Sequence, residues 1–317
     1  MDVGGGIEQL YFVTVFLTGH GTHIESGRSA DWTGTGFIYG VQTDQGQANF
    51  LVTNKHVFDG GDGVTASKLD MRLIAADADG KPDFGQEAKI TLERGPGDIL
   101  GHEDNDVDVA VIPFQFIHDA MHSAGINPFF RVIGGDIVLS EAKLSEEASA
   151  LEDVVFIGYP SGIYDTANLT PVARRGMTAT PIALDYQKKP AYLIDGAVFE
   201  GSSGSPVFLY GPAPQREGGP FTLGPGTRLK FAGILASVHT RQKLGTVIEL
   251  PTALASVSTE HLGLGIVYKP WTIDACVDRK LEQAGLKREF GETSADESGS
   301  VADRELTEQA SPTTADG

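Results

Sequence analysis

Short runs of β-branched and aromatic residues alternate with clusters of Gly, Asp and Asn from Ile7 to about Phe116. This alternation is typical of an antiparallel barrel or sandwich, in which short strands are joined by turns. It predicts six strands, at residues Leu10–Leu17, Gly34–Val41, Asn49–Thr53, Met71–Ala75, Ile90–Glu93 and Val109–Phe114. Closing a sheet into a barrel removes its exposed edges. We therefore expect the first half of the chain, residues 1–138, to form a closed six-stranded barrel.

A second β-rich half follows the charged segment 139–153, which we interpret as a connection between two domains. In residues 154–285, strands are predicted at Val154–Gly158, Arg174–Met177, Ala191–Asp195, Pro206–Tyr210, Phe231–Val238 and His261–Tyr268. Apolar residues at helical spacing in Ile273–Ala284, followed by Gly285, predict a C-terminal helix that covers the second half. Residues 286–317 are acidic and have few large apolar side chains, so we expect a disordered tail.

Two short segments resemble metal sites only in part. Residues 77–83 contain three aspartates but lack the acidic pattern and the distal glutamate of a calcium loop, which favours a hairpin turn. His118 and His122 would share one face of a helix. Neither a glutamate after the first histidine nor a third ligand can be identified, so an exposed helical turn is favoured over a zinc site.

Composition and charge narrow the classes of partner and the cellular compartment. The formal net charge of −19 argues against a nucleic acid or an anionic membrane as partner, because both would be repelled. Cys276 is the single cysteine, so no intramolecular disulfide can form, and we expect a reducing, cytoplasmic environment. The apolar run Leu10–Leu17 lacks the basic flank and cleavage site of a signal peptide and is too short to span a membrane.

The segment Phe199–Phe208 contains Gly201-Ser202-Ser203-Gly204 and is the strongest candidate for chemistry. A serine hydroxyl is a weak nucleophile that needs exposure in a tight turn, a base and donors for the oxyanion that forms. Gly201 has no Cβ, so its N–H and that of Ser203 can turn toward one point. We therefore take Ser203 as a candidate nucleophile and these two N–H groups as a candidate oxyanion hole.

Two further motifs accompany this turn, Phe50–Val57 with His56 near its end and Asp108-Val109-Ala110-Val111-Ile112. With the order His, Asp, Ser, the three motifs resemble those of the trypsin-like (chymotrypsin-fold) serine peptidases, above all the bacterial branch without disulfides. The order excludes α/β-hydrolases. The resemblance extends over residues 8–270 and implies an all-β fold of two six-stranded antiparallel barrels with a protein or peptide substrate between them.

In such a peptidase, His56 would be the general base, Asp108 would orient its imidazole, and Ser203 would attack the scissile carbonyl. Asp106 is an alternative to Asp108, because residues two apart on a strand share a face. No metal or organic cofactor is needed. Ser202 replaces the aspartate that pairs with a newly cleaved N-terminus in digestive members, so the oxyanion turn must be ordered in another way.

The resemblance also places the primary specificity pocket at five residues: Ala197, Val198, Ser237, Val238 and His239. Ala197, six residues before Ser203, would form the floor and offers no countercharge to Lys or Arg, so a small or medium aliphatic P1 residue is expected. Asp195 or His239 could instead favour a basic or an acidic P1 residue.

Other functions remain possible with the same motifs. A catalytically silent protein could use the cleft to bind a peptide or partner, and a hydrolase acting on esters is a further alternative. A regulatory partner protein is an additional hypothesis for a peptidase in the cytoplasm.

Overall fold

The structure is a computed structural model that describes residues 6–61, 63–93, 99–199, 201–212, 227–244 and 257–289. Residues 212, 227, 237–244 and 257–262 are described by their backbone alone. No helix in these ranges is both long enough and apolar enough to span a membrane.

The first half is a curled sheet of eight antiparallel strands, joined in the order β5-β4-β1-β2-β3-β7-β6, with β8 beside β4. The strands are β1 (Thr14–His23), β2 (Ser29–Thr43), β3 (Gly46–Thr53), β4 (Val64–Ala76), β5 (Pro82–Glu93), β6 (Leu100–Gly101), β7 (Ala110–Pro113) and β8 (Pro128–Phe129). The prediction of a closed six-stranded barrel is therefore wrong for this half. The terminal strands β5 and β6 do not pair in the described ranges, and β6 has only two residues with which to close a seam.

The first strand of this half begins later than predicted. Residues Glu8–Phe12 form a 3₁₀ helix (η1) rather than the start of a strand, and β1 begins only at Thr14. An apolar run with both faces buried does not distinguish helix from strand, which explains the error. Residues 77–81 form the predicted turn, closed by the Asp77 N–H on the Lys81 carbonyl at 2.8 Å.

The remaining small helices connect the strands. They are α1 (Lys55–Asp59), α2 (Gln115–Ser123), η2 (Gly135–Ile137), α3 (Leu144–Glu147), η3 (Pro160–Gly162) and η4 (Tyr186–Lys188). The predicted connection 139–153 contains α3, and its Leu139 and Leu144 are buried in the core of the second half.

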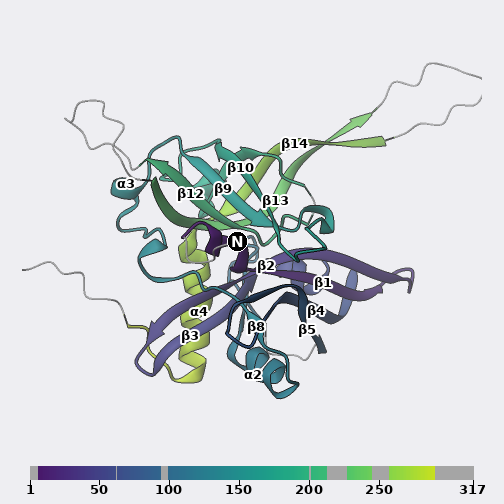
Figure 1. The fold of residues 1–317 in the computed structure, drawn as a ribbon. Helices are drawn as coiled ribbons and strands as arrows, with labels where there is room; N and C mark the ends of the chain where they lie inside the picture. The colour runs from purple at the N-terminus through teal and green to yellow at the C-terminus, as the bar shows by residue number, and fades with distance from the viewer. Residues whose placement is uncertain are drawn as a thin grey trace, which may run out of the picture.

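The second half is the predicted closed six-stranded barrel, with strand order β10-β11-β14-β13-β12-β9. Its strands are β9 (Asp153–Gly158), β10 (Val172–Thr178), β11 (Ala191–Gly196), β12 (Pro206–Pro212), β13 (Thr227–Leu244) and β14 (Val257–Tyr268). Figure 1 shows this barrel above the curled sheet of the first half.

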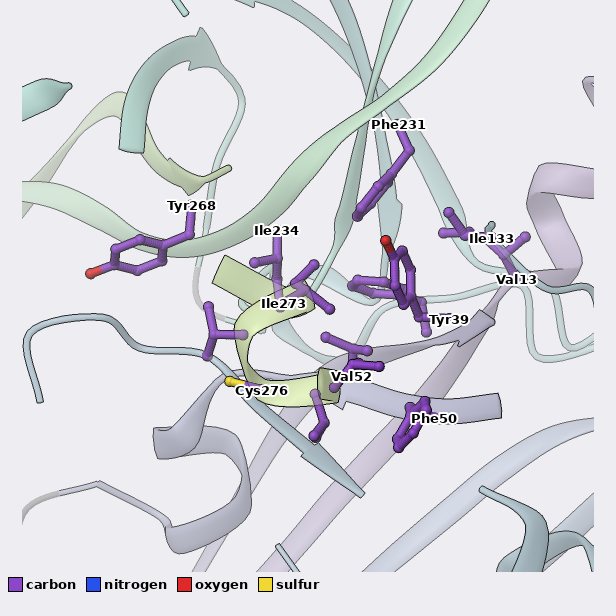
Figure 2. Packing of buried hydrophobic residues seen from close by; sticks show 14 of the residues in the cluster. Val13, Tyr39, Phe50, Val52, Ile133, Phe231, Ile234, Tyr268, Ile273 and Cys276 are labelled. Atoms are coloured by element: carbon purple, nitrogen blue, oxygen red, sulfur yellow. The ribbon is translucent and has the colours of Figure 1, made fainter. Parts of the chain in front are cut away.

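Helix α4 (Pro270–Ala284) begins three residues earlier than predicted, with a proline in its first turn, and ends at Gly285, which has a left-handed φ of 69°. It packs on β6 and β7 of the first half as well as on β13 of the second. Ile273 and Cys276 of the helix share one buried cluster with Tyr39 and Phe231 from the two halves (Figure 2). The helix therefore joins both halves, whereas the sequence predicted that it covers the second alone.

The chain after α4 continues along the first half. The Asp44 N–H donates to the Lys287 carbonyl at 3.0 Å, and the Glu289 N–H donates to the Gln42 carbonyl at 2.9 Å. Arg288 lies 2.9 Å from Asp274 and 2.8 Å from Asp278, both on α4. The four residues 286–289, predicted as the beginning of the tail, are thus attached to the fold, and residues 290–317 lie outside the described part of the chain.

Candidate functional site

Ser203 lies in a tight turn between β11 and β12. Within the turn, the Ser202 N–H donates to the Phe199 carbonyl at 3.1 Å, and the Ser205 N–H donates to the Ser202 carbonyl at 3.0 Å. The turn also docks on the first half, because the Thr35 N–H donates to the Ser203 carbonyl at 2.9 Å. The backbone around Ser203 is therefore held by both halves of the molecule.

Two glycines flank Ser203 in backbone conformations that other residues rarely adopt. Gly201 has a φ of 77° and Gly204 a φ of 85°. A Cβ on Gly204 would lie 1.7 Å from the Thr35 carbonyl oxygen, and a Cβ on Gly201 would lie 2.8 Å from the Tyr159 carbonyl oxygen. Backbone atoms cannot yield as a flexible side chain can, so the close docking of this turn requires glycine at both positions.

The N–H groups of Gly201 and Ser203 have no acceptor within the part of the chain that the structure describes. By contrast, the N–H of Gly204 donates to the Leu235 carbonyl at 2.7 Å, and that of Ser202 is used inside the turn. Two unpaired N–H groups on either side of one residue can donate to an oxygen that becomes negative during a reaction.

His56 lies in α1, directly after β3. Its Nδ1 is 2.5 Å from Asp108 Oδ2, and its backbone N–H donates to Asp108 Oδ1 at 3.3 Å. The Asn54 side-chain amide donates to the Asp108 carbonyl at 2.6 Å and holds Asp108 against the start of the helix. Since Asp108 occupies Nδ1, His56 Nε2 is left for a second partner. The His56 side chain is 41% exposed, so a substrate can reach it.

Asp106 does not take part in this pair. Its Oδ2 lies 3.1 Å from Lys189 Nζ, at an exposed position, and this hydrogen bond raises the pKa of Lys189. The Asp106 carbonyl accepts a hydrogen bond from the Tyr268 hydroxyl at 2.6 Å, and burial raises the pKa of that hydroxyl. Of the two aspartates on this segment, Asp108 is the one that contacts His56.

The segments that carry Ser203 and His56 lie against each other. Gly204 packs on Thr53, three residues before His56, so closely that an added Cβ would lie 2.5 Å from Thr53 Oγ1. The Ser203 hydroxyl donates to the Ala236 carbonyl of β13 at 2.9 Å rather than to the imidazole. Transfer of its proton to His56 therefore requires the hydroxyl to leave the Ala236 carbonyl.

The residues expected in the specificity pocket occupy different environments. Ala197 is exposed just after β11, whereas Val198 is 1% exposed and belongs to the core of the second barrel. Asp195 is exposed near the end of β11. Ser237, Val238 and His239 lie on β13, and their side chains fall outside the described part of the structure.

The sequence analysis missed Arg174, whose side chain lies behind the Ser203 turn. Arg174 Nη1 donates to the Ala197 carbonyl at 2.7 Å and to the Ser202 hydroxyl at 2.9 Å. The sequence indicates the direction of Arg174 only through the alternation of side chains along β10, in which Arg175 is exposed and Arg174 faces inward. That signal identifies an inward-facing residue but not its partners.

No group of three or more His, Cys, Asp or Glu side chains within the described ranges could hold a metal ion. His118 and His122 lie on α2, and His122 Nδ1 contacts the Asn127 side-chain oxygen at 3.2 Å.

The chain matches one family model and is similar to solved structures. The family model described as trypsin-like peptidase domain matches residues 34–211, more than half of the chain. Among solved structures, Deg5 is similar at 17% identity and a TM-score of 0.36, over 73% of this chain and 82% of that one. A scabies mite inactivated protease paralogue is similar at 12% identity and a TM-score of 0.39, over 88% of this chain and 98% of that one. No curated protein sequence matches the chain significantly.

Proposed function

The chain belongs to the trypsin-like peptidase family, and we propose that it is a serine endopeptidase that acts through Ser203, His56 and Asp108. The observation that carries the proposal is the contact of 2.5 Å between His56 Nδ1 and Asp108 Oδ2, beside a turn that presents Ser203 between two glycines. Peptidase chemistry requires an oriented imidazole and an exposed hydroxyl on the two sides of a cleft.

In the proposed reaction, the Ser203 hydroxyl moves from the Ala236 carbonyl to His56 Nε2 and gives up its proton as its oxygen attacks the scissile carbonyl. Asp108 stabilises the imidazolium that forms. His56 then protonates the leaving amine, and an acyl group remains on Ser203. A water molecule, deprotonated by His56, attacks the acyl group; the bond to Ser203 breaks, the carboxylic acid product leaves, and His56 returns the proton to the Ser203 oxygen.

The negative oxygen of each tetrahedral intermediate would be bound by the unpaired N–H groups of Gly201 and Ser203. Loss of one such donor commonly lowers kcat by about 10²–10³. In this proposal the backbone N–H at position 201 acts on the reaction, and the glycine allows the conformation that presents it.

The proposed substrate is a protein or peptide with a small or medium aliphatic P1 residue. Ala197 offers the pocket no negative charge, and Arg174 lies behind its carbonyl, which further disfavours a basic P1 side chain. A peptide library with mixed P1 residues measures this preference. Cleavage mainly after Lys or Arg would point to Asp195, and cleavage mainly after Glu would point to His239.

A catalytically silent binding protein is the second candidate, and the bond from Ser203 to the Ala236 carbonyl favours it, because the hydroxyl is not engaged with the base. A fluorophosphonate probe distinguishes the two. We expect wild-type protein to be labelled at Ser203, and both Ser203→Ala and His56→Ala to remain unlabelled. Absence of labelling in the wild type would favour the binding protein.

Comparing peptide with ester substrates then separates a peptidase from an esterase.

A further inference from the structure

Arg174 is an inward-facing cation in the second barrel, and its described neighbours provide no negative charge. The side chain stacks over the Phe156 ring, with Cζ 4.6 Å from the ring centroid. No carboxylate lies within ion-pair distance of it among the described residues, and its Nε and Nη2 are buried without a hydrogen-bond partner there. Burial lowers the pKa of Arg174 to about 10, so the guanidinium is still charged near neutral pH.

The neighbouring residue shows that this placement is not a general property of the strand. Arg175 is exposed and forms an ordinary surface ion pair with Asp153 at 2.7 Å. A buried cation without a countercharge destabilises a fold unless hydrogen bonds compensate for lost solvation. In Arg174 the compensating bonds come from a single nitrogen, Nη1, and both end on the turn that precedes Ser203.

These two bonds connect the two ends of the turn. One goes to the Ala197 carbonyl at 2.7 Å and the other to the Ser202 hydroxyl at 2.9 Å. The Ser202 side chain is fully buried, and its Oγ also accepts the Phe199 N–H at 3.2 Å. Ser202 lies directly between the two residues whose N–H groups are unpaired, so a shift of Ser202 would move both of those groups.

We propose that Arg174 is a positioning residue that orders the oxyanion turn of the proposed peptidase by binding Ala197 and Ser202 from inside the barrel. The guanidinium also adds positive charge behind the turn where negative charge would develop in the substrate. The expected effect of Arg174 on turnover rests on the proposed function. Its expected effect on the order of the turn is independent of that function.

The test compares Arg174→Met with wild type and with the matched control Arg175→Met, all in the full chain. The first measurement is amide hydrogen exchange in peptides covering residues 197–205. We expect Arg174→Met to speed exchange there about tenfold or more, as local opening of a turn does, and Arg175→Met to leave it unchanged. Unchanged exchange in Arg174→Met would overturn the proposal.

The second measurement is steady-state kinetics on a cleaved peptide. Because the turn acts on the transition state, Arg174→Met should lower kcat about 100-fold and change KM little, as expected for a lost oxyanion donor. The melting temperature should change little, because Arg174 is only partly buried and Met can occupy the place of its aliphatic stem. A fall in kcat matched by a fall in melting temperature would show a merely structural role and would also overturn the proposal.

Two more variants keep the test decisive if Arg174→Met does not fold. Arg174→Lys keeps the charge but cannot reproduce the guanidinium geometry, so partial activity is expected. Ser202→Ala removes one of the two acceptors and should change exchange and kcat in the same direction. If the wild type neither turns over peptide nor reacts with the fluorophosphonate, the proposed function fails, and the exchange experiment still decides whether Arg174 orders the turn.

Discussion

Asp108 holds His56 by both carboxylate oxygens, one on the ring and one on the backbone N–H. The aspartate therefore fixes the position of the helix start as well as the ring tautomer. An amide in its place could still accept one of these bonds, but it would present a donor toward Nδ1 and favour the wrong tautomer.

We predict that Asp108→Asn folds normally but has a kcat about 10⁴-fold lower than wild type, as expected when a triad imidazole is held in the wrong tautomer. Asp106→Asn serves as the control. Among the described residues its side chain pairs with Lys189 alone, at an exposed position where ion pairs contribute little, so activity and stability should change little. Kinetics and thermal unfolding of the two variants check this. Greater damage from Asp106→Asn would move the catalytic role to that residue.

Cys276 is 1% exposed on the inner face of α4, and burial raises the pKa of its thiol to about 12. The thiolate is the reactive form, and at pH 8 very little of it is present in the folded protein. We predict that iodoacetamide leaves native Cys276 unmodified for hours and modifies it rapidly in denaturant, where the thiol returns to its ordinary pKa. Mass spectrometry of both samples measures this. Rapid modification of the native protein would mean that α4 detaches readily.

At the scale of elements, the sequence indicates local motifs well and long-range partners poorly. His56, Asp108 and Ser203 each lie in a short segment with a characteristic pattern, so they could be proposed as candidate site residues without knowing the fold. Arg174 could not, because its partners Ala197 and Ser202 are distant in the sequence. That the first sheet stays open could not be predicted either, since closure depends on whether the terminal strands β5 and β6 pair, and β6 has only two residues.

The end of α4 is a second case in which long-range contacts decide the structure. Residues 286–289 hold three charged side chains and a single apolar one, Leu286, and follow the helix stop at Gly285, a pattern that predicts the beginning of a tail. The backbone bonds to Gln42 and Asp44 and the ion pairs of Arg288 attach them to the fold instead. The sequence around Asp274 and Asp278 does not indicate that Arg288 would be their partner.

We predict different outcomes for two truncations at this point. A chain ending at residue 289 should keep its stability and activity, because residues 286–289 and all their contacts remain. A chain ending at residue 286 loses the ion pairs of Arg288 with Asp274 and Asp278, although Asp274 keeps its bond from the Tyr39 hydroxyl, and this loss should cost about 1–3 kcal/mol. Urea unfolding of the two proteins measures the difference. Equal stabilities would show that these contacts add nothing.

At the scale of the whole molecule, the two halves share one core through α4. Tyr39 of β2, Phe231 of β13 and Ile273 of α4 belong to a single buried cluster. Thr35 adds polar contacts across the same boundary, where its Oγ1 donates to the Gly201 carbonyl at 3.2 Å and accepts the Tyr159 N–H at 3.1 Å. Such coupling favours unfolding of the described fold as one unit.

We predict a single thermal transition in which probes of the two halves coincide. Ile273→Ala removes a side chain that is 0% exposed and should lower stability by about 2–5 kcal/mol without splitting the transition. Far- and near-ultraviolet circular dichroism on heating measure this. A variant that melts in two steps would contradict the shared core.

The position of α4 in the sequence has a consequence for the order of synthesis. A ribosome releases His56, Asp108 and Ser203 before the helix whose apolar side joins their two halves. Ribosome-stalled chains that expose only residues up to 268 should therefore not react with a fluorophosphonate, whereas chains that expose residue 289 should. A reactive shorter chain would show that α4 is dispensable for the site. The proposed peptidase would thus become reactive only after α4 has left the ribosome.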